Sequence, residues 1–588
     1  MTISTAPQLR QTYQLWTRFS MPVDGGTRDA IAVPGYVASQ LNSAYTILVT
    51  SMVMNLWCIL FAIAFFYMLN RDQHHRIYTS LWNKRASLTD SLFEVLQPTE
   101  TGHWRQRWIY PVLLVIFACW VAQNVVSIIV PPYIIVANAA PVNPAAILAR
   151  PNTDTSSGKQ LPPSALAELF SLEAPSALRA AGGAQVASVN TESKVSAEVT
   201  TLGTTKDGET IERIDYGYNV SGADLGLQKF PTLLLEVVGA CTTEYGWLIS
   251  SSNASGYTND TYAKFGDPSL GTISLNIFDG TAPIAFFYSG PTPPGAPGNT
   301  TWAAFISSVD RVSYTQGTDP LYNTGSSVKA GLAGTGYAVK PRRPVLSCWQ
   351  TDTWRYNGLS STIIGLNSTA LPGLDLSPGM QLILARYLGQ PRIVSIGRQL
   401  GLSALLSSTN SIGDIFNAGS SSAFSDLRRL VLAAYIATAN TLTDLTLYPG
   451  DVPDRNSSAG NLAVDESGGV KPGVAEFVVW SADITTLSVK AITIIPILAF
   501  ILWLLALSLL RWSPLRIVNA LDAAVLHKYL VDDYGARPNR TGTWHQRGNG
   551  MDLESKGGHP AESNSEHAAE GLKRLVTDEV KEAPREGD

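Results

Sequence analysis

The cysteines with the clearest chemical meaning are Cys241 and Cys348, which both lie in the large segment 131–490. Two thiols in an oxidising compartment usually form a disulfide. A bond here would close a loop of about 100 residues, and the chain-entropy model assigns such a loop about 4 to 5 kcal/mol. We therefore predict a disulfide between them. Two separate buried thiols are the alternative, because pairing requires Cα atoms less than about 7 Å apart.

Tryptophans follow both of these cysteines. Trp349 and Trp354 belong to the run SCWQTDTW at 347–354, and Trp247 lies shortly after Cys241. Indole rings bury a large area and often flank disulfides, so the structural interpretation is a disulfide packed under these rings. The functional alternative is an aromatic ligand platform formed by the three tryptophans.

Histidine is missing from the segment 131–490, although the chain has seven histidines in all. Without histidine this segment has neither Ser-His-Asp nor Cys-His nucleophilic chemistry, and it has no histidine-ligated zinc site. The segment contains many Asp and Glu residues, so a glycosidase that uses two carboxylates remains a possible function. No sequence feature identifies which two carboxylates would act. The sequence therefore assigns no catalytic residue, no metal ligand and no cofactor. It favours a role other than catalysis.

The segment 131–490 is flanked by apolar runs. Three such runs without a charged residue occur in the chain, at 46–69, 109–130 and 491–510. Each is long enough to cross a hydrocarbon core of about 30 Å as a helix. Only 15% of the chain is charged, against about 25% in soluble proteins. We predict a membrane protein with three transmembrane helices. Pro496 interrupts the third, which is tolerated where a neighbour satisfies the freed carbonyl group.

Basic residues orient the predicted helices. The connector 70–108 carries six of them, whereas the leading segment 1–45 carries three. The positive-inside rule makes the connector cytoplasmic, so that 1–45 and 131–490 are extracellular. No cleavable signal peptide precedes residue 46, and the first helix is expected to act as a signal-anchor. We expect the plasma membrane rather than an endomembrane. The six basic residues are Arg71, Arg76, Lys84, Arg85, Arg105 and Arg107.

Six Asn-x-Ser/Thr triplets lie in the predicted ectodomain. Given this topology they are candidate glycosylation sites. They are weak evidence for sidedness, because about four would occur by chance in a segment so rich in Ser and Thr. A seventh triplet, at Asn539, falls in the predicted cytoplasmic tail. The six candidate sites are Asn219, Asn253, Asn259, Asn299, Asn367 and Asn456.

The ectodomain 131–490 is predicted to be mixed α+β. Apolar residues at helical spacing predict helices at 379–388 and 422–445. Proline, glycine and polar residues predict a stalk at 141–164. Runs rich in β-branched and aromatic residues predict strands at 186–202, 211–220, 232–238, 272–278 and 283–288.

The cytoplasmic side is predicted to have two parts. Apolar residues three or four apart at 511–534 predict an amphipathic juxtamembrane helix. The polar, charged segment 535–588 is predicted to be a disordered tail, open to a cytosolic partner. A net charge of -5 argues against a nucleic-acid partner, so the lipid bilayer is the main environment that the sequence specifies.

The Cys-Trp-Gln-x-Asp-x-Trp run at 348–354, the two early spans, the glycosylation triplets and the last span with its charged tail resemble uncharacterised fungal integral membrane proteins. The resemblance implies this architecture and no reaction. The sequence thus predicts an integral membrane glycoprotein whose ectodomain binds an extracellular or wall-associated glycan or protein, in adhesion or sensing. Two alternatives are an outer-face carboxylate-dependent glycosidase and an accessory subunit of a channel or transport complex.

Overall fold

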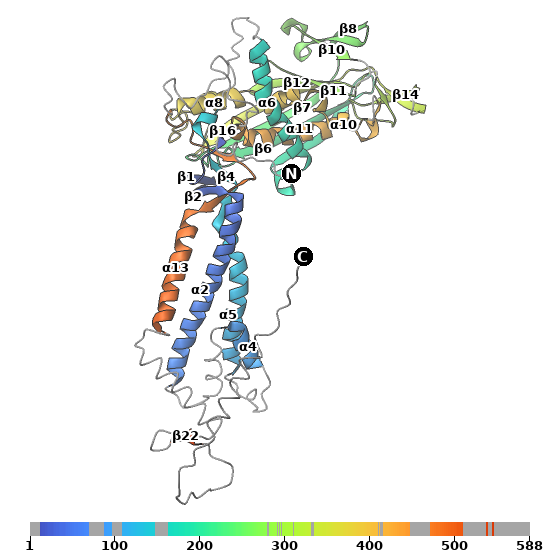
Figure 1. Ribbon diagram of the computed structural model, residues 1–588. Coiled ribbons are helices and arrows are strands. Elements are labelled where there is room, and N and C mark those ends of the chain that lie inside the picture. Colours follow the sequence, from blue (N-terminus) through green and yellow to red (C-terminus); the bar gives the residue numbers. More distant parts are fainter. Residues whose placement is uncertain are drawn as a thin grey trace, which may run out of the picture. The chain divides into compact units, whose positions relative to one another are not determined.

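The computed structural model (Figure 1) describes most of the chain between residues 12 and 509. The chain divides into two compact units, Met1–Leu56 with Ala118–Leu504, and Trp57–Phe117 with Leu505–Asp588. The described residues are 12–69, 87–96, 109–147, 163–278, 282–290, 292, 295, 297–309, 311–330, 334–409, 411, 415–446, 471–509, 537–538 and 544–545.

Three long helices are rich in apolar residues: α2 (Gly35–Leu69), α5 (Ile109–Ile129) and α13 (Val489–Leu507). Two stretches, Gly35–Ile63 and Val489–Leu507, are long and apolar enough to cross a membrane. The apolar stretch Leu113–Ile129 of α5 is shorter than such a span. Two of the three predicted spans therefore correspond to helices of sufficient length among the described residues. α2 begins at Gly35, before the predicted start at residue 46, and directly follows a β-hairpin.

A four-stranded antiparallel sheet joins α2 to α13, in the order β1-β2-β20-β3. β2 (Gly26–Pro34) runs directly into α2, and β20 (Ile484–Ser488) runs directly into α13. β1 (Arg18–Val23) and β2 form a hairpin across Asp24-Gly25, where Gly25 has the positive φ of +81° that short hairpin turns require. β3 (Ile135–Ala137) follows α5 through a 3₁₀ turn. The leading segment therefore contributes two strands that no sequence pattern predicted.

A hydrogen bond between helices compensates for Pro496. This residue lies inside α13 and has no N–H, so the carbonyl of Ile492, four residues earlier, lacks its helical donor. The hydroxyl of Tyr45 in α2 donates to that carbonyl at 2.8 Å. Tyr45 is buried in an apolar cluster with Val33 and Leu487 from the adjoining strands. The freed carbonyl is thus satisfied by a neighbouring helix, as a proline in an apolar helix requires.

The centre of the large domain is a seven-stranded antiparallel sheet with the order β11-β12-β16-β7-β6-β5, and β17 pairs with the end of β16. The predictions at 211–220, 232–238 and 283–288 correspond to β6, β7 and β11. The prediction at 186–202 is wrong in its first half, because Ser188 accepts a hydrogen bond from Thr191 N–H and starts the short helix α7 (Val189–Glu192). The strands are β5 (Val195–Thr204), β6 (Thr210–Ser221), β7 (Leu234–Glu244), β11 (Ile284–Gly290), β12 (Thr300–Ser307), β16 (Val345–Tyr356) and β17 (Leu359–Ser361).

One face of this sheet is covered by helices (Figure 1). α9 (Arg392–Leu400) and α11 (Ala423–Ala439) contact the sheet, and α6 (Pro163–Gln185) packs on both of them. Gly397 lets α9 approach β11 closely, because a Cβ at this position would lie 2.4 Å from the ring of Phe287. The predicted helix at 422–445 is α11 followed by α12 (Thr441–Asp444), with Ser422 accepting a hydrogen bond from Ser425 N–H at its start.

The stalk predicted at 141–164 is wrong at both ends that the structure describes. Pro141 is buried in β4 (Ala139–Pro141), which pairs with β19 (Val478–Trp480). Ser164 lies in the first turn of α6. Residues 148–162 lie outside the described residues. Proline and glycine content therefore predicted an exposed connection where the chain forms a buried strand and a helix.

The second face of the sheet carries a smaller three-stranded sheet, β8 (Leu248–Ala254), β9 (Tyr257–Ala263) and β10 (Thr272–Phe278), the last of which was predicted. Trp247, Tyr262 and Phe305 pack together between the two sheets. The remaining elements of the domain are α8 (Pro378–Leu388), which was predicted, α10 (Leu406–Thr409), β13 (Val312–Ser313), β14 (Thr324–Ala330), β15 (Gly334–Val339) and β18 (Ile415–Phe416).

The predicted cytoplasmic segments lie mainly outside the described residues. In the connector the structure describes α4 (Leu88–Leu96), and the six basic residues used for orientation are outside the described part. The predicted juxtamembrane helix 511–534 is also outside it. In the tail, β21 (Arg537–Pro538) pairs with β22 (Trp544–His545).

Candidate functional site

The disulfide joins the two central strands of the seven-stranded sheet. Cys241 in β7 lies directly opposite Cys348 in β16, with their Cα atoms 4.1 Å apart. Opposed residues approach this closely at a non-hydrogen-bonded pair of antiparallel strands, which brings their Cβ atoms together. Both side chains are buried under the helices. The pairing is the one that the sequence predicted.

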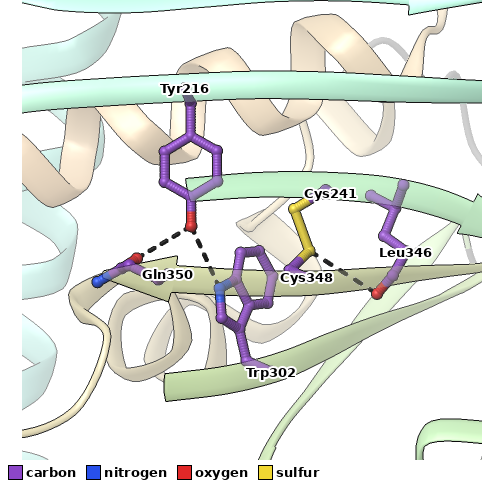
Figure 2. Close-up of a disulfide and its surroundings, with 6 residues drawn as sticks. All are labelled: Tyr216, Cys241, Trp302, Leu346, Cys348 and Gln350. Carbon is purple, nitrogen blue, oxygen red and sulfur yellow. Dashed lines mark hydrogen bonds between the residues drawn. A yellow bond between two sulfur atoms is a disulfide. The ribbon is translucent and has the colours of Figure 1, made fainter. Parts of the chain in front are cut away.

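Alternate residues of β16 point to opposite faces of the sheet, and Cys348, Gln350 and Trp354 all point towards the helices. Gln350 belongs to a chain of buried polar contacts (Figure 2). Trp302 Nε1–H donates to the hydroxyl of Tyr216 at 3.3 Å, and that hydroxyl donates to Gln350 Oε1 at 3.0 Å. Gln350 Nε2 then donates to Asp352 Oδ1 at 2.7 Å. Gln350 and Asp352 of the 348–354 motif are therefore internal cross-links of the domain.

Gly239 makes room for this network on strand β7. A Cβ at this position would lie 2.4 Å from the ring and the hydroxyl of Tyr216. The Tyr216 ring therefore crosses the strand where the side chain is missing and reaches Gln350 on the next strand. Burial raises the pKa of the Tyr216 hydroxyl well above its usual value. The hydroxyl consequently stays protonated and acts as donor and acceptor at once.

Asp352 ends the network and gives the domain a testable pH dependence. Burial raises the pKa of this carboxyl group to about 6. Because the folded pKa exceeds the unfolded value, the group stabilises the fold fully below about pH 4, and this contribution is lost as the pH rises through 6. The loss amounts to as much as about 3 kcal/mol.

We expect Asp352→Asn to remove this part of the pH dependence, since the amide oxygen still accepts from Gln350. The measurement is denaturant unfolding of the full chain in detergent at pH 4 and pH 7, followed by tryptophan fluorescence. The drop in the free energy of unfolding between the two pH values should be about 2 kcal/mol smaller for the variant than for the wild type. Equal drops in both proteins contradict the assignment.

The structure does not bring the three predicted tryptophans together as a platform. Trp354 is fully buried beneath the helices. Trp247 is buried between the two sheets, and its Nε1–H donates to Glu244 Oε2 at 3.0 Å. Trp349 is partly exposed on the face opposite Trp354, because residues five apart in a strand point in opposite directions.

Trp349 lies on an open part of that second face. Its cross-strand neighbours are Ala240 and Thr301, which are small and buried. Nearby on the same face Val238 is 46% exposed, and Arg213 forms a half-exposed ion pair with Asp215 at 2.7 Å. The face thus presents one indole ring among small and polar side chains. We call the exposed and partly exposed residues among them (Arg213, Asp215, Val238 and Trp349) the open face.

The candidate glycosylation sites differ in accessibility. Asn219 is exposed on β6, Asn253 is exposed on β8, and Asn299 is exposed before β12. Asn259 and Asn367 are partly buried, and Oδ1 of Asn259 is buried without a hydrogen-bond partner in the central strand β9. Asn456 lies outside the described residues.

The buried carboxylates of the domain hold backbone in place. Asp319 accepts hydrogen bonds from the N–H groups of Leu321 and Ala423, and burial raises its pKa to about 7. Asp426 accepts from Ser407 N–H and from the hydroxyl of Tyr322. Among the described residues no group of three or more His, Cys, Asp or Glu could hold a metal ion.

A cavity of about 20 Å³ lies between α6, α9 and α12, which is room for about one water molecule. Its carboxylates are bound within the protein, since Asp444 accepts from Ser176 and Arg179, and Glu173 accepts from Gln399. We assign it a structural role.

The family comparison covers the domain just described. A family model described as "Domain of unknown function (DUF8406)" matches residues 174–479. No curated protein and no solved structure matches the chain.

Proposed function

The chain belongs to the family described as Domain of unknown function (DUF8406), and we propose that it is an integral membrane glycoprotein of the cell surface. In this proposal the large domain lies outside the cell, held by α2, α5 and α13, and binds a wall-associated or extracellular glycan through its open face. The plasma membrane is the proposed location. Adhesion or sensing is the proposed role.

The exposure of the apolar helices supports the membrane part of the proposal. Only 22% of the most apolar window of Gly35–Ile63 and 11% of that of Val489–Leu507 are buried. The core helix of a soluble protein would be mostly buried, and exposed apolar surface of this extent is typical of a contact with lipid. The disulfide supports an oxidising compartment for the domain. In this proposal the whole domain lies on one side of the membrane, because it follows α5 and precedes α13 in the chain.

Trp349 is the observation that carries the binding part of the proposal. A partly exposed indole on a flat sheet can stack on the apolar face of a sugar ring, while neighbouring charged and hydroxyl groups bond to the ring hydroxyls. The half-exposed Arg213–Asp215 pair supplies charged groups on the same face as Trp349. An extended polysaccharide suits a flat, open surface better than a small molecule does, because small molecules require a concave pocket.

We expect Trp349→Ala to weaken binding of the full chain in detergent to insoluble β-glucan or chitin by about tenfold, since buried aromatic anchors dominate such interfaces. The measurement is depletion of the protein from solution at increasing amounts of polysaccharide. Trp16→Ala is the matched control, because Trp16 is 58% exposed and lies outside the open face; it should bind as the wild type does. Equal binding by both variants, or no binding by the wild type, contradicts the glycan proposal.

A further inference from the structure

Strand β5 is an edge of the seven-stranded sheet in the described part of the chain. Among the described residues, β6 is the only strand that pairs with it. Most of its side chains are exposed, and its sequence VSAEVTTLGT contains one charged residue, Glu198. Native proteins usually protect a long edge with several charges, prolines or a covering element, because its free N–H and C=O groups recruit another strand. β5 has one charge and no proline, and its bulge comes only after Thr201.

The backbone groups at this edge can be assigned from the register. Glu212 N–H donates to Thr243 Oγ1 at 2.8 Å, so the main chain of Glu212 faces β7. Orientation alternates along an antiparallel strand, and the main chain of Arg213 therefore faces β5, where it lies opposite Thr200. It follows that Thr200 bonds to β6 and that the N–H and C=O of Val199 point away from the sheet.

The same alternation applies to the neighbouring positions. Glu198 lies opposite Asp215 and bonds to β6, while the main chains of Ala197 and Thr201 point outwards with that of Val199. A register shift between Thr201 and Gly203 ends the regular edge. A second extended segment can pair with donors and acceptors at this spacing along the whole edge.

We propose that this segment is β5 of a second copy of the chain, paired antiparallel with Val199 opposite Val199. An antiparallel pair related by a two-fold axis is self-complementary, which is the usual way in which identical chains associate. A register centred on Glu198 would oppose two carboxylates. The register centred on Val199 places Glu198 opposite Thr200 and covers Val199, which is 45% exposed. The two sheets then continue into each other across the dimer.

Cysteine cross-linking tests this register in the full chain in detergent. Glu198 and Thr200 of partner strands form a non-hydrogen-bonded pair in the proposed dimer, a geometry in which Cα atoms about 4.5 Å apart suit a disulfide. The double variant E198C/T200C should give a disulfide-linked dimer on mild oxidation, at least about tenfold above the parent chain, which retains Cys58 and Cys119. E198C and T200C alone should remain at the level of the parent. A double variant at the parent level, or one cross-linked to a different protein, overturns the proposal.

A proline substitution gives an independent readout by light scattering in detergent. Val199→Pro removes an N–H that points away from β6, so the fold tolerates it as edge strands tolerate proline, while the dimer loses its central hydrogen bonds. We expect the dissociation constant of the dimer to rise about tenfold or more. Val199→Thr keeps the N–H and should preserve the dimer. A monomeric wild type, or a dimer that Val199→Pro leaves unchanged, overturns the proposal.

Discussion

Replacing both cysteines, in C241A/C348A, is expected to lower the free energy of unfolding by about 4 to 5 kcal/mol. The bond links residues 107 positions apart, and without it the unfolded chain regains the entropy of a long open loop. The effect is large because the loop encloses every strand from β8 to β15 and ends in the two central strands. Denaturant unfolding of the full chain in detergent, with and without reductant, measures it.

The two other cysteines provide the control for this experiment. Cys58 in α2 and Cys119 in α5 take part in no disulfide in the described part of the chain. C58A/C119A should change the free energy of unfolding by less than about 1 kcal/mol and should leave the response to reductant intact. If C241A/C348A also stays within about 1 kcal/mol of the wild type, the loop-entropy account of the disulfide is wrong.

Trp302→Ala is expected to cost about 3 to 5 kcal/mol, the usual effect of deleting a fully buried aromatic side chain. Trp302 has no exposed surface, lies opposite Cys348, and packs near the ring of Phe287. Its loss leaves a cavity beneath the helices and removes the donor to the Tyr216 hydroxyl. Trp302→Phe keeps most of the ring but not the N–H, and should cost about 1 to 2 kcal/mol less than the alanine variant.

Trp349→Ala serves as the matched control on the neighbouring strand. The two tryptophans differ in the face that they occupy, since Trp302 is buried and Trp349 is partly exposed. Trp349→Ala should therefore lower the free energy of unfolding by about 1 kcal/mol or less. Equal losses for both alanine variants would show that the two faces of the sheet are covered alike, contrary to the description of the open face.

Periodicity and composition predicted the helices and strands whose local sequence pattern matches the side that they bury in the fold. β10, α8 and α11 were found in this way, because each buries one regular stripe of side chains. The β1–β2 hairpin and α6 were missed. α6 contains Pro175 and two adjacent glycines, which weaken its helical pattern, and it is held by packing on α9 and α11. Long-range packing of this kind leaves no local signal.

The sequence was sufficient to predict the disulfide of the candidate site, but not the face of the sheet on which each tryptophan lies. Cysteine count and compartment predicted the Cys241–Cys348 pair, whereas the tryptophans were grouped by their distance along the chain. The period of two in a strand separates Trp349 from Trp354, and this follows from sequence once 345–356 is recognised as one strand. The burial of Trp247 depends on the second, smaller sheet and could not be inferred from its neighbours in sequence.

The hydrogen bond between Tyr45 and Ile492 joins residues 447 positions apart. During synthesis this contact can therefore form only long after α2 has been made. A ribosome adds about 5 to 20 residues per second, so α2 waits roughly 20 to 90 s for α13 to emerge. During that interval β2 has an unpaired edge where β20 will bind. The nascent protein therefore completes its junction last, and any chain that stops before residue 484 exposes this edge to the quality-control machinery.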